Sequence, residues 1–360
     1  MRIVHVEFGT RSYDIVIGPG ARREVRRAVN VAGRGARQVV LVSDETVFRL
    51  HGATMLDALG TSTPVVGIPP GEGSKTLEAV ERVCERLAEH RIERGGVLVA
   101  FGGGVVGDLA GFVAATWLRG IDFIQVPTTL LAAVDASIGG KTGVNLRAGK
   151  NLVGAFHQPR AVIVDTEFLR TLPSREFAAG LAECIKHACI RDPDMLEVID
   201  RDAGAILARD GDALTDLVAR NCAIKADVVS RDEREADLRA ILNFGHTVGH
   251  AIESLLGYEL LHGECVGLGV RVENELAVAR GWLSRAEADR VAALLARAGL
   301  PAHLSRPLAA EDVWAACQVD KKVRGGAVNF VLLRALGAPE RVADVAAEDL
   351  AAALRVVQPD

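Results

Sequence analysis

Three histidines and one glutamate in the second half of the chain have the types and spacing of a metal site. His246 and His250 lie four residues apart in FGHTVGH (244–250), so a helix places both imidazoles on one face. His262 begins the segment HGE, and Glu183 lies in the largely apolar stretch GLAECIKHACI (180–190). Two or three imidazoles, with or without a carboxylate, are typical of a catalytic divalent-metal centre, most often zinc.

The alternative is a set of core histidines that are hydrogen-bonded to the backbone. A buried carboxylate is rare unless it is paired or coordinates a metal, so Glu183 favours the metal interpretation for the set as a whole. On spacing alone, His246 and His250 are the expected pair of ligands.

A glycine-rich turn in the first half is a candidate dinucleotide site. Gly102, Gly104 and Gly107 satisfy GxGxxG between an expected strand and an expected helix, where backbone N–H groups can bind a pyrophosphate. The alternative is a turn that only allows close packing of helix on strand. Asp44, which follows the expected strand 38–43, could bind the ribose or could cap the next helix.

A second turn, SIGGKT (137–142), ends like a P-loop. A Walker A motif requires glycine at position 135, where Asp135 stands, so an ATPase of that class is excluded. Lys141 is followed nine residues later by Lys150 and Asn151, and these two cations and one amide predict a bound phosphate.

Other charged and polar residues fall into two groups. Lys186, Lys225, Arg239 and Asn243 show no pattern of a solvated face and are candidate site residues. The mixed-charge run DERE (232–235) is interpreted as a solvated loop.

The elements that must position these residues differ between the two halves. Alternating residues over 4–17 predict a hairpin, and apolar runs predict strands at 38–43, 63–68, 96–101, 121–126 and 161–164, with a helix at 76–90. Helical patterns follow residue 173, including a capping box at Ser284, and one short isolated strand is expected at 328–333. The prediction is an α/β domain with a Rossmann-like parallel sheet (1–173) followed by a helical domain (174–360).

Composition excludes several classes of protein. The chain has 360 residues, of which 49% are apolar, and a formal net charge of −5, which argues against a disordered chain or a nucleic-acid-binding face. Its six cysteines include no CxxC pair, and it has neither a secretory h-region nor a long apolar run. We therefore expect a soluble cytoplasmic protein with no membrane or nucleic-acid partner.

Together these segments resemble the 3-dehydroquinate synthase family of sugar-phosphate cyclases. The resemblance covers nearly the whole chain in the right order and is carried by PPGEGSKT (69–76), GGGVVGDLAGFVAATWLRGI (102–121), VPTTLLAAVDASIGGKTGVN (126–145), GKNLVGAFHQP (149–159), GLAECIKHACIRD (180–192), LRAILNFGHTVGHAIE (238–253), LHGE (261–264) and DKK (320–322).

The resemblance implies roles for individual residues. It assigns the metal, Zn²⁺ or Co²⁺, to Glu183, His246 and His262, and moves His250 from the metal to the substrate phosphate. It implies a homodimer in which Arg119 reaches the partner's site, and a substrate contact from Lys321 or Lys322. The implied NAD contacts are Asp44, Gly71, Glu72, Lys75, Gly103, Gly104, Val105, Val106, Gly107, Asp108, Thr128, Thr129, Lys141, Lys150, Phe168, Leu169, Arg170 and Thr171. The implied substrate contacts are Asp135, Lys141, Asn151, Lys186, Lys225, Arg239, Asn243 and His250.

The implied reaction converts 3-deoxy-D-arabino-heptulosonate 7-phosphate to 3-dehydroquinate and phosphate in the shikimate pathway. NAD transiently oxidises a ring alcohol, phosphate leaves by β-elimination, the ketone is reduced again, and an intramolecular aldol step closes the carbocycle. Lys186 would support the developing alkoxide, while Arg239 and Lys225 would hold the carboxylate.

Departures from the family pattern leave alternatives open. His157, His187-Ala188 and Cys265 stand where family members often carry other residues. The alternatives are an aminodehydroquinate synthase, another sugar-phosphate cyclase, a metal-dependent polyol dehydrogenase or a nucleotide-sensing module without catalysis. The expected carboxylate and phosphate contacts favour the synthase.

Overall fold

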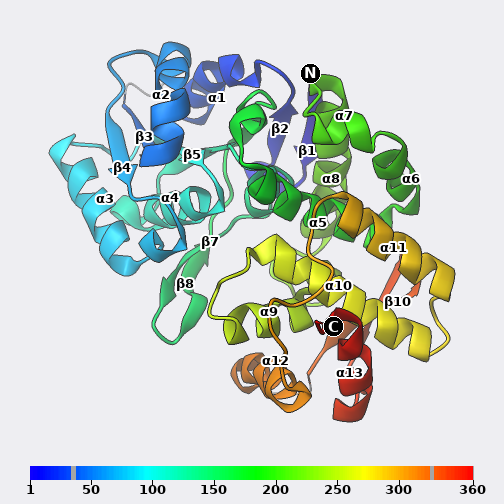
Figure 1. Ribbon diagram of the computed structural model, residues 1–360. Helices are drawn as coiled ribbons and strands as arrows, with labels where there is room; N and C mark the ends of the chain where they lie inside the picture. The colour runs from blue at the N-terminus through cyan, green and yellow to red at the C-terminus, as the bar shows by residue number, and fades with distance from the viewer. Residues whose placement is uncertain (34–37, 325–327, 360) are drawn as a thin grey trace. The chain divides into compact units, whose positions relative to one another are not determined.

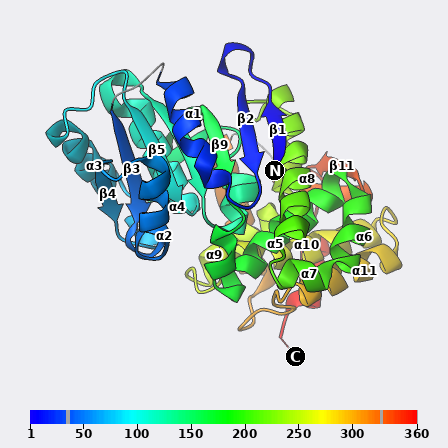
Figure 2. The same cartoon turned by 90° about the horizontal axis from the view of Figure 1, so that it is seen from above.

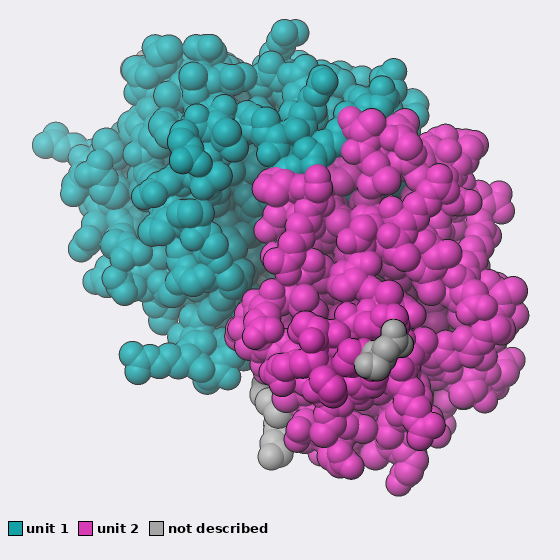
Figure 3. Space-filling model, in the orientation of Figure 1, with its two compact units in different colours: residues 1–172, 209–230 teal, residues 173–208, 231–360 magenta. Residues whose placement is uncertain are grey.

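The computed structural model describes residues 1–33, 38–324 and 328–359, and the chain divides into two compact units (Figures 1 and 3). Unit 1 comprises residues 1–172 and 209–230, and unit 2 comprises 173–208 and 231–360. The first crossing lies beside the expected boundary at residue 173, but the chain later returns to unit 1. This return differs from the two uninterrupted domains that the sequence predicted.

The returning segment is helix α8, Gly211–Arg231. Its buried face includes Leu214, Leu217 and Val218, and Asp216 forms an ion pair with Arg2 of the N-terminal strand at 2.9 Å. Helical periodicity in a sequence shows that one face is buried, but it does not show which neighbour buries it. The sequence therefore predicted this helix without placing it in the first unit.

Unit 1 is built on a seven-stranded sheet, as the pattern of alternating strands and helices predicted. The strand order is β1-β2-β9-β6-β5-β3-β4, in which β1 runs antiparallel to β2 and every other neighbouring pair is parallel. The strands are β1 Arg2–Val6, β2 Tyr13–Ile17, β3 Val39–Asp44, β4 Val65–Ile68, β5 Val97–Gly102, β6 Asp122–Pro127 and β9 Ala161–Val164.

Helices cover both faces of this sheet (Figure 2). Alternate strand residues point to opposite faces, so Val40 and Leu98 pack with helices α3 and α4, whereas Leu41 and Val99 pack with α1 and α2. Burial on both faces explains why these strands read as continuous apolar runs. The helices are α1 Val25–Ala32, α2 Glu45–Leu59, α3 Leu77–Glu89 and α4 Gly104–Thr116.

Two hairpins extend what the sequence predicted. Strands β7 Lys141–Leu146 and β8 Gly149–Phe156 pair antiparallel in unit 1, where no strands were expected. The strand expected at 328–333 is β10, Phe330–Ala335, but it is not isolated, because it pairs antiparallel with β11, Ala338–Val342. Pro339 and the two charges in APERV had masked the strand character of β11.

The rest of unit 2 is helical. Its helices are α5 Ser174–Arg191, α6 Pro193–Arg201, α7 Ala203–Leu207, α9 His246–Leu255, α10 His262–Ala279, α11 Arg285–Arg297, α12 Ala310–Arg324 and α13 Ala347–Leu354. The capping box predicted at Ser284 is present, with the Ser284 hydroxyl accepting the N–H of Glu287 at 3.2 Å. In the part of the chain that the structure describes, no helix is both long and apolar enough to span a bilayer.

Two glycines let α10 approach its neighbours at backbone distance. A Cβ on Gly263 would lie 2.0 Å from the carbonyl oxygen of Ala179 on α5, and a Cβ on Gly269 would lie 2.0 Å from the carbonyl oxygen of Gly245, just before α9. Real Cβ atoms do not come this close, so only glycine allows the observed packing. Helix α10 is thereby held against the helices that carry Glu183 and His246.

This packing predicts opposite effects for two substitutions on α10. Gly269→Ala should lower the free energy of unfolding by about 1–3 kcal/mol, because its Cβ meets backbone atoms that cannot move aside. Gly267→Ala is the matched control: its Cβ has no neighbour closer than 3.6 Å, so the variant should be as stable as the parent or gain up to about 1 kcal/mol. Urea unfolding followed by circular dichroism measures both, and equal stabilities would contradict the packing argument.

Candidate active site

The predicted dinucleotide contacts follow the carboxyl ends of the parallel strands of unit 1. Asp44 ends β3, Gly102 ends β5, Thr128 follows β6, and the segments 71–75 and 168–171 follow β4 and β9. Carboxyl ends of parallel strands meet at one edge of a sheet, so most of the predicted set gathers there. The exceptions, Lys141 and Lys150, lie on the β7–β8 hairpin.

The glycine turn lies where the order of the strands in the sheet reverses. From β3 the chain adds β4 on one side and then β5, β6 and β9 on the other, so the switch point lies between β3 and β5. Ligands of open α/β sheets bind outside the carboxyl ends at such a point. This topology explains how a GxGxxG motif can serve a nucleotide although it begins a hundred residues into the chain.

The glycines of this turn have different roles. A Cβ on Gly102 would lie 2.4 Å from Val106, and one on Gly107 would lie 2.7 Å from Gln125, so a side chain at either position would displace its neighbour in the packing of α4. Gly103 is the N-cap of α4 and has no side chain to satisfy the N–H groups of the first turn. The packing explanation therefore holds for two glycines, and the helix N-terminus retains the geometry for a phosphate.

Asp44 caps helix α2. Its Oδ1 accepts the N–H groups of Thr46 and Val47, both at 2.9 Å. The capping role that the sequence left open is thus present, and a ribose contact would have to use the second oxygen.

Lys75 is at the centre of a buried polar network in unit 1. Its Nζ donates to Asp108 Oδ2 and to Asn151 Oδ1, both at 2.6 Å, and only 4% of Lys75 is exposed. Burial raises the pKa of Asp108, and the Lys75 charge opposes that shift. An ammonium group only donates, so it orients the oxygen of the Asn151 amide toward itself and leaves the NH₂ group as the part that can donate to an anion. The orientation suits the predicted phosphate contact.

Lys225 on α8 pairs with Asp135. Its Nζ donates to Oδ1 and to the main-chain oxygen of Asp135, both at 2.6 Å, which joins α8 to the π-helical turn Ala132–Ala136. The sequence grouped Lys225 with Arg239 as carboxylate-binding residues. The structure places Lys225 in unit 1 and Arg239 in unit 2.

In unit 2, Glu183 lies between two histidines. Its Oε1 is 3.6 Å from His246 Nε2 and 3.9 Å from His262 Nε2, and 1% of its side chain is exposed. Lys186 forms an ion pair with Oε2, yet neither oxygen accepts a hydrogen bond from the residues that the structure describes. A buried carboxylate facing two imidazole nitrogens is a donor set that a divalent cation would satisfy.

The two histidines present the nitrogen that a metal requires. His246 Nδ1 is 3.1 Å from the Phe244 carbonyl oxygen, and His262 Nδ1 is 3.3 Å from Glu253 Oε2. Because an acceptor fixes the proton on Nδ1 in each ring, the Nε2 lone pair faces Glu183. Burial, and then the charge of Lys186, lowers the pKa of His246 well below 6.5, which favours the neutral imidazole that binds metals.

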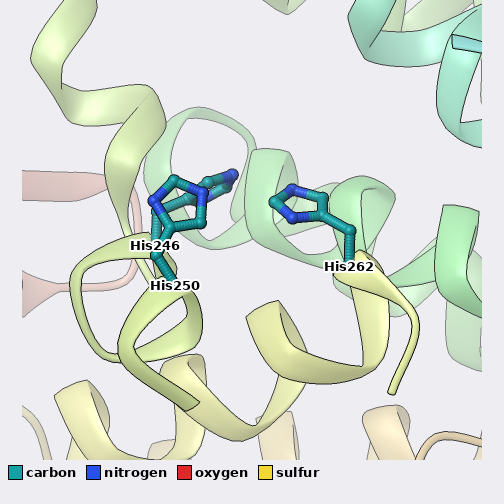
Figure 4. Close-up of side chains that lie close together, drawn as sticks. All are labelled: His246, His250 and His262. Atoms are coloured by element: carbon teal, nitrogen blue, oxygen red, sulfur yellow. The ribbon is translucent and has the colours of Figure 1, made fainter. Parts of the chain in front are cut away.

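His250 belongs to a second possible ligand group. The three imidazoles of His246, His250 and His262 point toward one another, with one nitrogen of each within 4.8 Å of the others (Figure 4). His250 is the exposed member of this group, whereas Glu183 is fully buried. The two sets share His246 and His262 and differ in whether the third ligand is Glu183 or His250.

The mixed-charge run 232–235, which precedes Arg239, is not simply a solvated loop. The guanidinium of Arg239, which is 2% exposed, donates through Nη1 to the Glu233 carbonyl at 2.6 Å, and Asn243 Nδ2 donates to Glu235 Oε1 at 2.8 Å. The run therefore positions two predicted substrate-binding side chains. The eight-residue spacing of Glu235 and Asn243 gave no local signal, because the contact depends on the turn η7, Leu238–Asn243.

Other predicted residues have simpler placements. Arg119 ends the turn η4, Trp117–Arg119, with φ of 69°, and the side chains of Lys321 and Lys322 lie outside the described residues. His157 donates through Nε2 to the Ile121 carbonyl oxygen at 2.8 Å and stacks on Phe123, so this departure from the family pattern has a packing role.

Glu273 is a buried carboxylate that the sequence did not single out. Glu273 on α10 accepts the N–H of Gly245 at 2.6 Å, directly before α9. Burial raises the pKa of Glu273 to about 8, against the opposing effect of the nearby N–H groups. Glu273 lies in a helix that is buried along most of its length, and in the sequence it stands beside Arg271, Asn274 and Glu275, so it was not distinguishable from a surface glutamate.

Two family models match this chain across most of its length. The model described as 3-dehydroquinate synthase N-terminal matches residues 65–179, and the model described as 3-dehydroquinate synthase C-terminal matches residues 180–323. The chain belongs to the 3-dehydroquinate synthase family. The resemblance drawn from the motifs is thereby confirmed.

Curated members of the family align over almost all of the chain. The 3-dehydroquinate synthase of Opitutus terrae is 48% identical over 356 residues, which is 98% of each chain. The 3-dehydroquinate synthase of Pseudomonas aeruginosa is 47% identical over 359 residues, which is 99% of this chain and 96% of the other.

Solved structures confirm the predicted fold class. A 2-deoxy-scyllo-inosose synthase, in complex with carbaglucose-6-phosphate, NAD⁺ and Co²⁺, is 28% identical with a TM-score of 0.85 over 94% of both chains. A 2-epi-5-epi-valiolone synthase from Streptomyces hygroscopicus, with NAD⁺ and Zn²⁺ bound, is 30% identical with a TM-score of 0.88 over 99% of this chain and 98% of the other.

The two ligand sets of this family member predict different metal contents. If Glu183 is the third ligand, Glu183→Gln should lose stoichiometric zinc, because an amide is a poorer ligand than a carboxylate, while His250→Ala should retain it. Elemental analysis of the purified variants after dialysis measures both. Retention of zinc by Glu183→Gln together with its loss in His250→Ala would assign the ion to the three histidines.

Glu273 predicts a pH dependence of stability in the metal-free protein. The carboxyl is protonated in both states below about pH 4.5, and as the pH rises toward about 8 only the unfolded chain loses that proton, so the Glu273 contribution lowers the free energy of unfolding across this window. Glu273→Gln removes the titration and retains an acceptor for Gly245. Urea unfolding at about pH 5 and about pH 8 measures the free energy of unfolding of both proteins. The value for Glu273→Gln relative to the parent should be higher at about pH 8 than at about pH 5, and the same difference at both pH values would contradict the prediction.

Proposed function

We propose that this chain converts 3-deoxy-D-arabino-heptulosonate 7-phosphate to 3-dehydroquinate and phosphate, with NAD and a divalent ion, Zn²⁺ or Co²⁺. The observation that carries the proposal is the buried carboxylate of Glu183 facing the Nε2 atoms of His246 and His262. Curated synthases at 47–48% identity over nearly the whole chain support the same activity.

When bound, NAD would accept and return a hydride and the divalent ion would act as a Lewis acid. Glu183, His246 and His262 would hold the ion, and Glu253 would keep the His262 ring oriented through Nδ1. The Lys186 ammonium, which is fully buried beside Glu183, would stabilise negative charge that develops on a substrate oxygen.

The substrate carries two anionic groups, and the chain has candidates for each. The Asn151 amide, oriented by Lys75, would donate to the phosphate together with Lys141 and the exposed His250. The Arg239 guanidinium, fixed on one side by the Glu233 carbonyl, would give the carboxylate a bidentate contact. In the β-elimination the C–O bond to the phosphate would break while an oxygen of that phosphate takes the proton from the carbon beside the ketone, and His250 would hold the leaving phosphate.

The wider assignments are part of the same proposal. NAD would lie along the carboxyl ends of the strands of unit 1, with its pyrophosphate at the N-terminus of α4. The active form would be a homodimer to which Arg119 contributes across the interface, and the reaction would belong to the shikimate pathway in the cytoplasm. Light scattering of the purified protein tests the dimer.

The direct experiment uses the purified protein with NAD⁺, zinc and the heptulosonate phosphate. Phosphate and dehydroquinate should appear in equal amounts without net NADH, because the hydride is returned. Sustained NADH production would indicate a polyol dehydrogenase. Turnover of glucose 6-phosphate, or preference for the amino analogue of the heptulosonate, would indicate another cyclase or an aminodehydroquinate synthase.

Arg239→Lys should lower kcat/KM more than tenfold, equivalent to about 1.4 kcal/mol in the activation barrier, because a planar fork is replaced by a point charge. Arg234→Lys is the matched control, since Arg234 is exposed and lies in the mixed-charge run 232–235. Steady-state kinetics of both variants measure the difference, and unchanged values for Arg239→Lys would argue for a substrate without a carboxylate.

A further inference from the structure

An ion pair connects the first turn of α10 to the first turn of α5. Arg175 Nε lies 2.7 Å from Glu264 Oε1, and Arg175 Nη2 lies 2.7 Å from Glu264 Oε2, which is the bidentate geometry of guanidinium and carboxylate. Glu264 lies two residues after His262, and its side chain is 8% exposed. Glu264 is the last residue of the LHGE motif, 261–264.

The same pair also holds the segment that leads into His262. Arg175 Nη2 donates to the Glu259 carbonyl oxygen at 3.2 Å, and Glu264 Oε2 accepts the N–H of Leu261 at 2.7 Å. Two side chains therefore connect three points of backbone: the start of α5, the segment before α10, and the first turn of α10. His262 lies between the last two.

One face of α5 meets the start of α10 at three successive turns. Arg175, Ala179 and Glu183 are spaced by four residues and so lie along one face of the helix. They contact Glu264, Gly263 and His262 respectively, through the bidentate pair, the close approach of Gly263 to the Ala179 carbonyl oxygen, and the 3.9 Å separation of Glu183 Oε1 from His262 Nε2. The contact at one end of this row is the ion pair, and the contact at the other end is the candidate metal site.

We infer that Arg175 and Glu264 are positioning residues for the metal: they set the place of His262 relative to Glu183 without touching the ion. The inference rests on the proposed metal-dependent function. Glu253 orients the His262 ring, whereas the Arg175–Glu264 pair holds the backbone that carries it. Arg175 is 55% exposed and Glu264 is 8% exposed, so water screens one end of the pair only, and its effect on stability has to be measured separately from its effect on ligand geometry.

The chain offers a matched control at the other end of α10. Arg285 and Glu275 form a second bidentate pair, which joins α10 to α11, and Arg285 is 54% exposed. Arg285→Met thus removes an arginine–glutamate pair of the same kind from the same helix, more than ten residues away from His262. If the role of Arg175 were purely structural, Arg175→Met and Arg285→Met would have the same effect on zinc binding and on the Co²⁺ spectrum.

The experiment compares the parent protein with Arg175→Met, Arg175→Lys, Glu264→Gln and Arg285→Met. Zinc dissociation constants come from competition with a chelator, the Co²⁺-loaded proteins give visible absorption spectra of the ligand geometry, and urea unfolding without metal gives stability. Glu264→Gln retains an acceptor for Leu261 and serves as the milder variant if Arg175→Met folds poorly.

We expect Arg175→Met and Glu264→Gln to weaken zinc binding about 10- to 100-fold and to alter the Co²⁺ spectrum. Arg285→Met should match the parent in both, and Arg175→Lys should recover part of the affinity. Equal zinc affinities for Arg175→Met and Arg285→Met would overturn the positioning role while leaving the proposed function intact. Absence of zinc and of turnover in the parent protein would overturn both.

Discussion

The buried carboxylate of Glu183 is the constraint on which unit 2 depends. Removing a charge from water is costly unless partners replace the lost hydration, and Lys186 forms an ion pair with Oε2 of this carboxylate. The other oxygen faces two imidazoles whose Nδ1 atoms are already engaged. Holding these groups together requires α5, α9 and α10 to approach at backbone distance, which Gly263 and Gly269 permit. In this unit, the close packing of the three helices and the arrangement of the candidate metal ligands therefore depend on each other.

In unit 1 the topology of the sheet determines where the predicted nucleotide contacts lie. A parallel sheet covered by helices on both faces brings the carboxyl ends of its strands to one edge, so segments more than a hundred residues apart contribute to one region. Gly102 and Gly107 allow α4 to pack closely, and this packing aims the N-terminus of α4 at that edge. A nucleotide site follows from the topology before any side chain is considered.

Neighbouring side chains determine what the predicted residues can do. Lys75 selects which end of the Asn151 amide faces it, Glu253 selects the tautomer of His262, and Lys225 is engaged by Asp135. In each case a group outside the reaction restricts a group proposed for it. Sequence motifs identify the residues proposed for the reaction far better than the residues that orient them. The orienting partners have ordinary residue types and no fixed spacing from the residues that they orient.

The sequence by itself determined the features that depend on neighbouring residues along the chain. Period-two and apolar runs located the sheet strands, the capping box located α11, and the histidine and glycine motifs located the candidate ligands and the phosphate turn. Only the tertiary structure decided that α8 joins unit 1 and that β10 pairs with β11. It also decided that Glu253 contacts His262, that Glu235 contacts Asn243 and that Arg175 contacts Glu264. These outcomes depend on contacts between segments whose separation along the chain is set by the fold, so no local pattern of residues encodes them.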